Sequence, residues 1–92
     1  MHPARAHLFI AGRVQGVFYR AYTRSVAVKF GLRGWVKNLY DGRVEAVFEG
    51  DKGLIEQAIE LCRKGPAGAH VTDIDISWEA YPGGEDGFEI KY

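Results

Sequence analysis

The sequence predicts an α+β fold in which two helices cover one face of an antiparallel sheet, and two observations lead to this prediction. Short stretches of alternating apolar and polar residues, typical of half-buried strands, recur along the chain. Two longer stretches between them repeat their apolar residues every three or four positions, as amphipathic helices do. The order is strand, helix, strand, strand, helix, strand, followed by a short terminal strand.

The chain begins with a predicted strand, a glycine-containing loop and a helix. Residues 7–11 alternate as a strand does, and Gly12 ends this strand before a loop that runs through Gly16. Residues 18–30 are predicted to be helical, with Gly31 at the C-terminal cap. The expected apolar stripe of this helix consists of Ala21, Tyr22, Val26, Ala27 and Phe30.

The middle of the chain predicts a β-hairpin. Residues 32–39 and residues 43–49 both alternate, and an Asp-Gly pair at positions 41 and 42 lies between them. Asp-Gly favours a tight turn because the glycine accepts a positive φ without steric cost. Gly50 is expected to end the return strand.

The last third of the chain predicts a helix and two strands. Asp51 is expected to cap the N-terminus of the second helix. The Gly-Pro pair at residues 65–66 is expected to end this helix. Residues 71–80 alternate as a fourth strand, and residues 88–92 are expected to form a short last strand. The second helix is expected to have an apolar stripe that consists of Leu54, Ile55, Ala58, Leu61 and Cys62.

Two strand-helix-strand halves joined by a hairpin predict a ferredoxin-like α/β sandwich, with both helices on one face of an antiparallel sheet. The length of 92 residues corresponds to a single domain, residues 1–92. This fold hosts many unrelated functions, so the function must be inferred from individual residues.

The composition narrows the possible functions. Twelve basic residues balance twelve acidic ones, and a nucleic-acid-binding protein usually has a basic excess, so we expect no nucleic-acid partner. The one cysteine, Cys62, allows neither an internal disulfide nor a cysteine-based zinc site, and the three histidines are not spaced as metal ligands. We therefore expect no metal and no cofactor. Without a signal peptide or a long apolar stretch, we expect a cytoplasmic protein that does not enter membranes.

The loop between the first strand and the first helix has the features of an anion site. Gly16 allows the backbone to turn, which leaves a row of N–H groups at the helix N-terminus. Arg20 lies in the first helical turn, where a cation costs up to about 1 kcal/mol against the helix dipole. An anion held between the amides and the guanidinium would explain this arginine. Ordinary turn glycines with Arg20 in solvent explain the pattern equally well.

Two motifs in this sequence resemble those of the acylphosphatase family. The first reads GRVQGVFYR over residues 12–20, and the second reads GWVKNLYDGRVE over residues 34–45. The Gly-Pro pair at residues 65–66 and the closing residues 87–92 are also similar to the family, so the resemblance covers almost the whole chain. Tyr19 and Tyr40 stand where the family more often has phenylalanine and proline.

The resemblance implies catalytic roles for Arg20 and Asn38. Arg20 would hold the phosphoryl group, and Asn38 would position the attacking water. An amide is no general base at neutral pH, but it accepts a hydrogen bond from water and so orients it. The phosphate would also be bound by backbone amides of Gln15, Gly16, Val17, Phe18 and Tyr19.

The activity that the resemblance implies is the hydrolysis of acyl phosphates to a carboxylate and inorganic phosphate, without a metal and without a covalent intermediate. A carboxylate departs without protonation, so binding of the phosphoryl charge and positioning of the water suffice. We expect a small-molecule acyl phosphate as substrate, phosphate or sulfate as competing anion, and a monomeric protein.

Two other functions remain open at this point. One is a module that binds phosphate or carbamoyl phosphate, related to the N-terminal domain of a hydrogenase-maturation carbamoyltransferase. No zinc-finger segment follows in this sequence, which favours the enzyme. The other is an interaction domain that keeps the fold without the chemistry, and the presence of both Arg20 and Asn38 argues against it.

Overall fold

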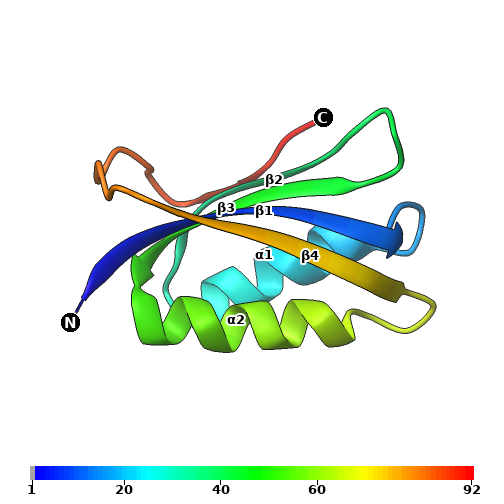
Figure 1. The fold of residues 1–92 in the computed structure, drawn as a ribbon, viewed down its shortest axis with the longest axis horizontal. Coiled ribbons are helices and arrows are strands. Elements are labelled where there is room, and N and C mark those ends of the chain that lie inside the picture. The colour runs from blue at the N-terminus through cyan, green and yellow to red at the C-terminus, as the bar shows by residue number, and fades with distance from the viewer. Residues whose placement is uncertain (1) are drawn as a thin grey trace.

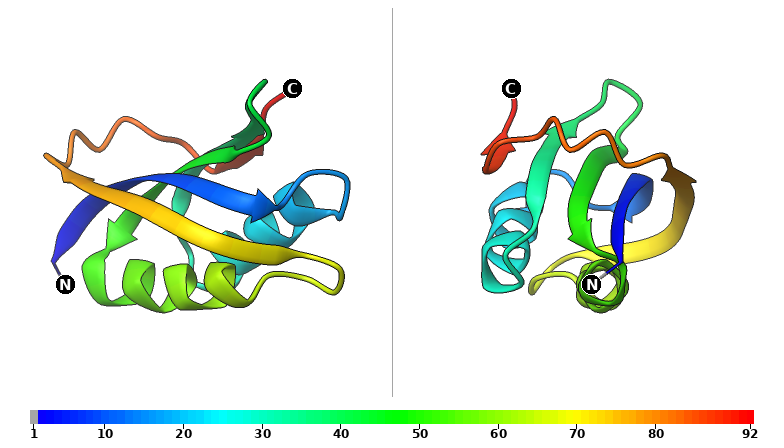
Figure 2. Two further views of the ribbon diagram at one scale, coloured as in Figure 1. Left: turned by 45° about the vertical axis from the view of Figure 1, so that its right-hand side comes forward. Right: turned by 90° about the vertical axis from the view of Figure 1, so that its left-hand side faces the viewer.

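Five strands form one sheet, and both helices cover the same face of it, in the computed structural model, which describes residues 2–92 (Figures 1 and 2). The strand order across the sheet is β4-β1-β3-β2-β5. The elements are β1 Pro3–Arg13, α1 Tyr19–Lys29, β2 Arg33–Asn38, β3 Val44–Asp51, α2 Lys52–Lys64, β4 His70–Glu79 and β5 Phe88–Ile90. The predicted ferredoxin-like sandwich is confirmed.

Both helices begin and end near the predicted residues. The Asp51 carboxylate accepts a hydrogen bond from the backbone N–H of Leu54 at 3.2 Å, so it caps α2 as expected. Gly65 follows the last turn of α2, and Gly31, at a φ of 67°, follows the end of α1. Glycine suits such a position because a positive φ costs it nothing.

The β2–β3 hairpin places Asn38 at the end of a strand. Asn38 pairs with Val44 in the last rung of the ladder between the two strands. Beyond this rung, the backbone N–H of Leu39 donates to the carbonyl of Arg43 at 2.8 Å, and Gly42 turns the chain at a φ of 95°. The predicted Asp-Gly hairpin is confirmed, and it holds the Asn38 backbone in a regular sheet.

The sheet is mixed, which corrects the prediction of an antiparallel sheet. The first four strands pair antiparallel, but β5 runs parallel to β2 along its edge. After β4 the chain crosses to the opposite edge of the sheet, so the last strand arrives in the same direction as β2 (Figure 2). Residue alternation predicts that a segment is a strand but carries no information about its direction.

Two predictions for individual residues are wrong. Gly50 does not end β3, because it lies inside the strand and pairs with Ala4. Ala21 is exposed rather than part of the core, because Tyr19 and Thr23 take the inward positions of the first turns of α1. Ala21 instead borders the cavity described below.

The core lies between the sheet and the two helices. Its fully buried apolar side chains include Leu8, Ile10, Tyr19, Val36, Val44, Phe48, Ile55 and Cys62.

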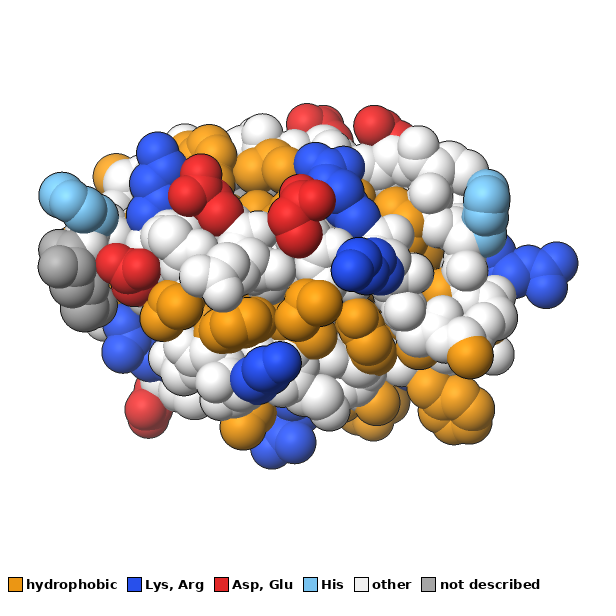
Figure 3. Space-filling view, turned by 90° about the horizontal axis from the view of Figure 1, so that it is seen from below, with side chains coloured by type: hydrophobic (Ala, Val, Ile, Leu, Met, Phe, Trp, Pro, Cys, Tyr) orange, Lys and Arg blue, Asp and Glu red, His pale blue; other side chains and the backbone are white. Residues whose placement is uncertain are grey.

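On the helix side of the molecule, basic and acidic side chains are interspersed around a band of apolar side chains (Figure 3). No helix among residues 2–92 is long and apolar enough to cross a membrane.

Candidate active site

The loop between β1 and α1 has an unusual backbone. Gly16 has a φ of 74° and Phe18 a φ of 60°, both in the left-handed region. Among residues 2–92, Phe18 is the only residue other than glycine with a positive φ, a conformation that costs about 1–2 kcal/mol. Its side chain is 85% exposed, so burial of the ring does not explain the strain. Strain of this kind is typical of functional loops, where the backbone itself has a role.

The backbone N–H groups of this loop are available to a ligand. Among the residues that the structure describes, none of the N–H groups of residues 15–20 donates to a backbone carbonyl. They lie at the N-terminus of α1, where the helix dipole is positive. Successive N–H groups around left-handed residues form a concave anion site. This confirms the geometry that the glycine spacing predicts, and the binding of a phosphate remains a prediction.

The C-terminal end of the loop is anchored to the core. Tyr19 is only 1% exposed, and its hydroxyl donates to the carbonyl of Cys62 in α2 at 2.7 Å. Burial and this hydrogen bond raise the pKa of the Tyr19 hydroxyl well above its ordinary value. Tyr19 can therefore contribute only its backbone to a bound anion. Its side chain holds the first turn of α1 in place.

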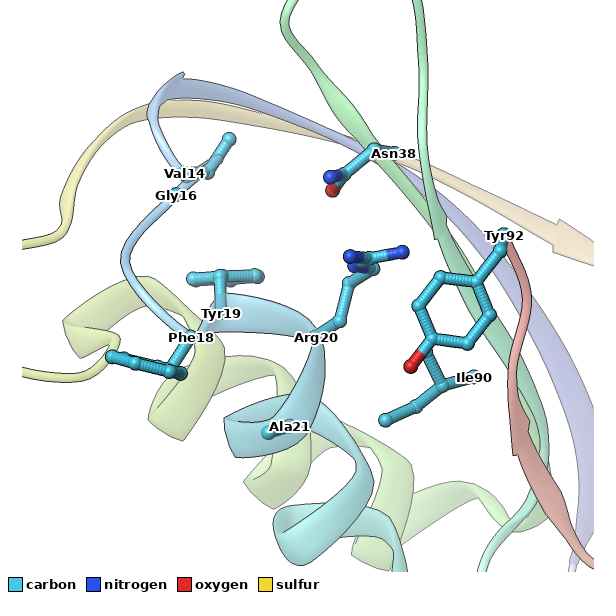
Figure 4. Close-up of a pocket in the computed structure, with 9 residues that line it drawn as sticks. All are labelled: Val14, Gly16, Phe18, Tyr19, Arg20, Ala21, Asn38, Ile90 and Tyr92. Atoms are coloured by element: carbon cyan, nitrogen blue, oxygen red, sulfur yellow. The ribbon is translucent and has the colours of Figure 1, made fainter.

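Arg20 carries a charge that no carboxylate neutralises within residues 2–92. Its Nη1 donates to the carbonyl of Lys91 at 3.2 Å, and its guanidinium lies 4.6 Å from the centre of the Tyr92 ring. Both contacts come from the segment after β5, and they hold the side chain over the cavity (Figure 4). The cation thus opposes the helix dipole without a carboxylate partner among residues 2–92, which is the arrangement expected of an anion-binding arginine.

Asn38 presents an unsatisfied hydrogen-bond acceptor. Its Oδ1 is buried and accepts no hydrogen bond from any residue that the structure describes. Buried side-chain oxygens in folded proteins almost always have a partner, so this exception requires an explanation. The side chain points into the same cavity as Arg20 (Figure 4). An acceptor in this position suits the O–H of a bound water.

One cavity brings these groups together. It has a volume of about 320 Å³, at the lower end of the range for small-molecule sites. Arg20 from α1 and Asn38 from the end of β2 point toward one another across it, while the Phe18 ring points away (Figure 4). The residues that line it are Val14, Gly16, Phe18, Tyr19, Arg20, Ala21, Asn38, Ile90 and Tyr92.

The Gln15 side chain is hydrogen-bonded to the hairpin that carries Asn38. Its Nε2 donates to the carbonyl of Leu39 at 2.7 Å and to that of Arg43 at 2.9 Å. Both hydrogens of the amide nitrogen are therefore used by the hairpin, and Gln15 has only its backbone N–H to offer an anion. The sequence does not reveal this contact, because it joins two segments that are distant along the chain.

The residues near the C-terminus are the part of the site that sequence reasoning missed. Ile90 and Tyr92 line the cavity, and the carbonyl of Lys91 holds Arg20. Alternation predicts a strand over residues 88–92, but it does not predict that this strand lies beside β2 and next to Arg20. The similarity of the closing residues to those of the acylphosphatase family is the one signal that could have pointed there.

Comparison with known proteins assigns this chain to one family. The acylphosphatase family model matches residues 6–90. A protein named acylphosphatase from Haloarcula marismortui is 52% identical over 92 residues and the whole length of both chains. Another from Roseiflexus is 51% identical over 90 residues, with 98% of this chain and 97% of the relative covered.

Solved structures agree with the sequence relatives. The crystal structure of an acylphosphatase from Bacillus subtilis has a TM-score of 0.94 and 36% identity, covering 97% of this chain and 99% of that one. T. kodakarensis HypF has a TM-score of 0.84 and 34% identity, but the match covers only 12% of its chain. The family model spans nearly all of this chain, and the relatives align over full length. This chain belongs to the acylphosphatase family.

Proposed function

We propose that this protein hydrolyses the carboxyl-phosphate bond of acyl phosphates, with Arg20 and the loop of residues 15–20 holding the phosphoryl group and Asn38 orienting the attacking water. The buried, unpaired Oδ1 of Asn38 is the observation that carries this proposal. It faces the cavity that Arg20 lines, so a water bound to it would lie beside a phosphoryl group at the loop.

In the proposed reaction the water oxygen attacks phosphorus, and the bond from phosphorus to the acyl oxygen breaks. The carboxylate leaves with the electron pair, and both protons of the water stay on the phosphate product. An acyl phosphate dianion and water thus give a carboxylate and dihydrogen phosphate. The Arg20 guanidinium and the loop N–H groups stabilise the charge that spreads over the equatorial oxygens. No group of the protein has to take up a proton.

The chemistry and position of Arg20 and Asn38 support this division of roles. Arg20 is permanently protonated and presents a planar fork of donors, which suits two oxygens of one phosphoryl group. Asn38 carries no charge, and its backbone lies on the last rung of the ladder between β2 and β3, where the sheet holds its position. A water that donates to an acceptor on this strand loses orientational freedom before the reaction, which lowers the barrier.

The experiment is hydrolysis of benzoyl phosphate in ¹⁸O-labelled water with excess EDTA. We expect turnover far above the spontaneous rate, with the label in inorganic phosphate rather than in benzoate. Inorganic phosphate and sulfate should compete with the substrate. Turnover that EDTA abolishes would contradict the metal-free reaction, and label in benzoate would contradict attack on phosphorus. Absence of any turnover would contradict the proposed function.

The second candidate is a module that binds carbamoyl phosphate without hydrolysing it, and the similarity to T. kodakarensis HypF is the observation that favours it. It is the weaker candidate because the match covers a small part of that protein. Binding of carbamoyl phosphate without turnover of any acyl phosphate would support it.

We also propose that the protein is a cytoplasmic monomer. A single cysteine fits a reducing compartment, where disulfides are rare. Light scattering and cell fractionation test the two statements separately.

A further inference from the structure

The Gln15 carboxamide joins the phosphate loop to the hairpin that carries Asn38. Its Nε2 donates to the carbonyls of Leu39 and Arg43, at 2.7 and 2.9 Å. Leu39 follows Asn38 directly, and Arg43 precedes the residue that pairs with Asn38. The amide therefore bridges both arms of the hairpin next to the last rung of the ladder.

The hairpin does not need Gln15 in order to close. The Arg43 carbonyl also accepts the N–H of Leu39 at 2.8 Å, and the Leu39 carbonyl accepts the N–H of Gly42 at 3.2 Å. Both acceptors therefore keep a partner if the glutamine amide is removed. The bonds from Gln15 add a connection to the loop rather than a condition for the turn.

No other hydrogen bond within residues 2–92 connects residues 14–18 with residues 38–43. The loop leads directly into Arg20, and the hairpin carries Asn38. The sheet also links the two segments, because Val44 pairs with Ile10 of β1 and with Asn38 of β2. Beyond these ladders, the Gln15 side chain is the direct hydrogen-bonded link between the loop and the hairpin among residues 2–92. A displacement of about 1 Å between a bound phosphoryl group and its attacking water can reduce a rate by about 100-fold.

We infer that Gln15 is a positioning residue for the reaction: it fixes Asn38 relative to the phosphate loop and does not touch the phosphoryl group. This inference rests on the proposed function, because it concerns the same site. It assigns the two donors of this side chain to the geometry between phosphate and water, not to anion binding.

Three roles for Gln15 predict different measurements. A positioning residue affects kcat through Asn38 and leaves the affinity for inorganic phosphate nearly unchanged. A phosphate ligand would weaken phosphate inhibition. A residue with only a structural role would lower thermal stability and leave kcat of the folded protein unchanged.

The test uses Gln15→Met, which keeps the length of the side chain and removes both donors. Gln57→Met is the matched control, because Gln57 is an exposed glutamine on α2. The measurements are kcat for benzoyl phosphate, the inhibition constant of inorganic phosphate and the midpoint of thermal unfolding. Gln15→Glu is the second variant, since its carboxylate has the same shape, donates nothing and repels both carbonyls.

We expect Gln15→Met to lower kcat by about 10- to 100-fold and to change the phosphate inhibition constant by less than about threefold. Gln15→Glu should lower kcat at least as much, and Gln57→Met should match the wild type. Combined with Asn38→Ala, Gln15→Met should have little further effect on kcat, because both changes disturb the same water.

Three results would overturn the inference: unchanged kcat in both Gln15 variants, a phosphate inhibition constant that rises in parallel with the loss of kcat, or a full effect of Gln15→Met in the Asn38→Ala background. Wild-type turnover of benzoyl phosphate is measured in the same series. If the wild type turns over normally and Gln15→Met does too, the inference fails and the proposed function stands.

Discussion

Arg20 and Asn38 lie on opposite sides of one cavity, the first on α1 and the second at the end of β2 (Figure 4). Arg20 forms no ion pair within residues 2–92, and in the same part of the chain no donor reaches the buried Oδ1 of Asn38. A cation and a neutral acceptor that face one small cavity suit two different parts of a reaction. In the proposed reaction, Arg20 stabilises the negative charge of the phosphoryl group, and Asn38 holds the water.

Replacement of Arg20 by lysine should impair both binding and catalysis. Lysine keeps the charge but loses the planar fork, the contact with the Lys91 carbonyl and the stacking on Tyr92. We expect kcat/KM to fall by about 100-fold or more and the inhibition constant of phosphate to rise.

Arg24→Lys is the control for this substitution. Arg24 lies one turn along the same helix, where its Nε is 3.4 Å from the carbonyl of Phe88. Its substitution should change kcat/KM by less than about twofold. Normal phosphate inhibition in Arg20→Lys would contradict the role of Arg20 as the phosphate ligand.

Gly34 should be irreplaceable by alanine for reasons of space and conformation. It has a φ of 139°, and a Cβ at this position would lie 1.9 Å from the backbone carbonyl oxygen of Val47 on β3. We expect Gly34→Ala to lower the free energy of unfolding by about 3 kcal/mol or more, measured by urea denaturation. Gly84→Ala should change it by less than about 0.5 kcal/mol, because Gly84 has open space around it. Equal stability of the two variants would contradict this explanation.

Arg5 should be required for stability because it is the cation that pairs with the fully buried Glu49. The Arg5 Nη1 lies 2.6 Å from Oε2 of Glu49, whose side chain is 0% exposed. Replacing Arg5 by methionine leaves a buried carboxylate without its cation, which costs about 3 kcal/mol. Adding Glu49→Gln to the Arg5→Met variant removes the buried charge and should restore most of the lost free energy of unfolding. The hypothesis is wrong if urea denaturation gives the single and double variants the same stability.

Stability should depend on pH through Asp51. Hydrogen bonds from the backbone N–H groups of His2 and Leu54 lower the pKa of this carboxyl in the folded state. A lowered folded pKa contributes stability above the unfolded value of about 3.9, and the contribution disappears as pH falls through the folded pKa.

Asp51→Asn isolates this contribution, because asparagine keeps a cap acceptor and does not titrate. The stability difference between the wild type and Asp51→Asn should be largest near neutral pH and should decrease under acidic conditions. Thermal unfolding across this pH range measures it. A difference that is independent of pH would contradict the linkage.

The sequence predicts the local elements well because local rules determine them. Asp51 caps α2, the Asp-Gly pair turns the hairpin, and Arg20 lies in the first turn of α1, all within a few residues of the signals that predict them. The two catalytic candidates are also predicted from the sequence, because each lies in a motif that resembles the family. Their meeting in one cavity follows from the fold.

The features that the sequence does not predict depend on contacts between distant segments. β5 pairs parallel to β2 because the chain crosses the sheet after β4. The support of Arg20 by Lys91 and Tyr92 follows from this crossing. The contact of Gln15 with the hairpin is missed for the same reason. A glycine-rich motif suggests backbone contacts to an anion, but it does not indicate where its glutamine side chain points.

The most direct test of the account is the effect of Asn38→Ala on kcat and on phosphate inhibition, measured with benzoyl phosphate on the same protein sample. If Asn38 orients the water while Arg20 and the loop hold the phosphate, kcat should fall by about 100-fold or more with the inhibition constant of phosphate nearly unchanged. Full kcat in Asn38→Ala, or a loss of phosphate inhibition that matches the loss of kcat, would contradict the separation of the two roles.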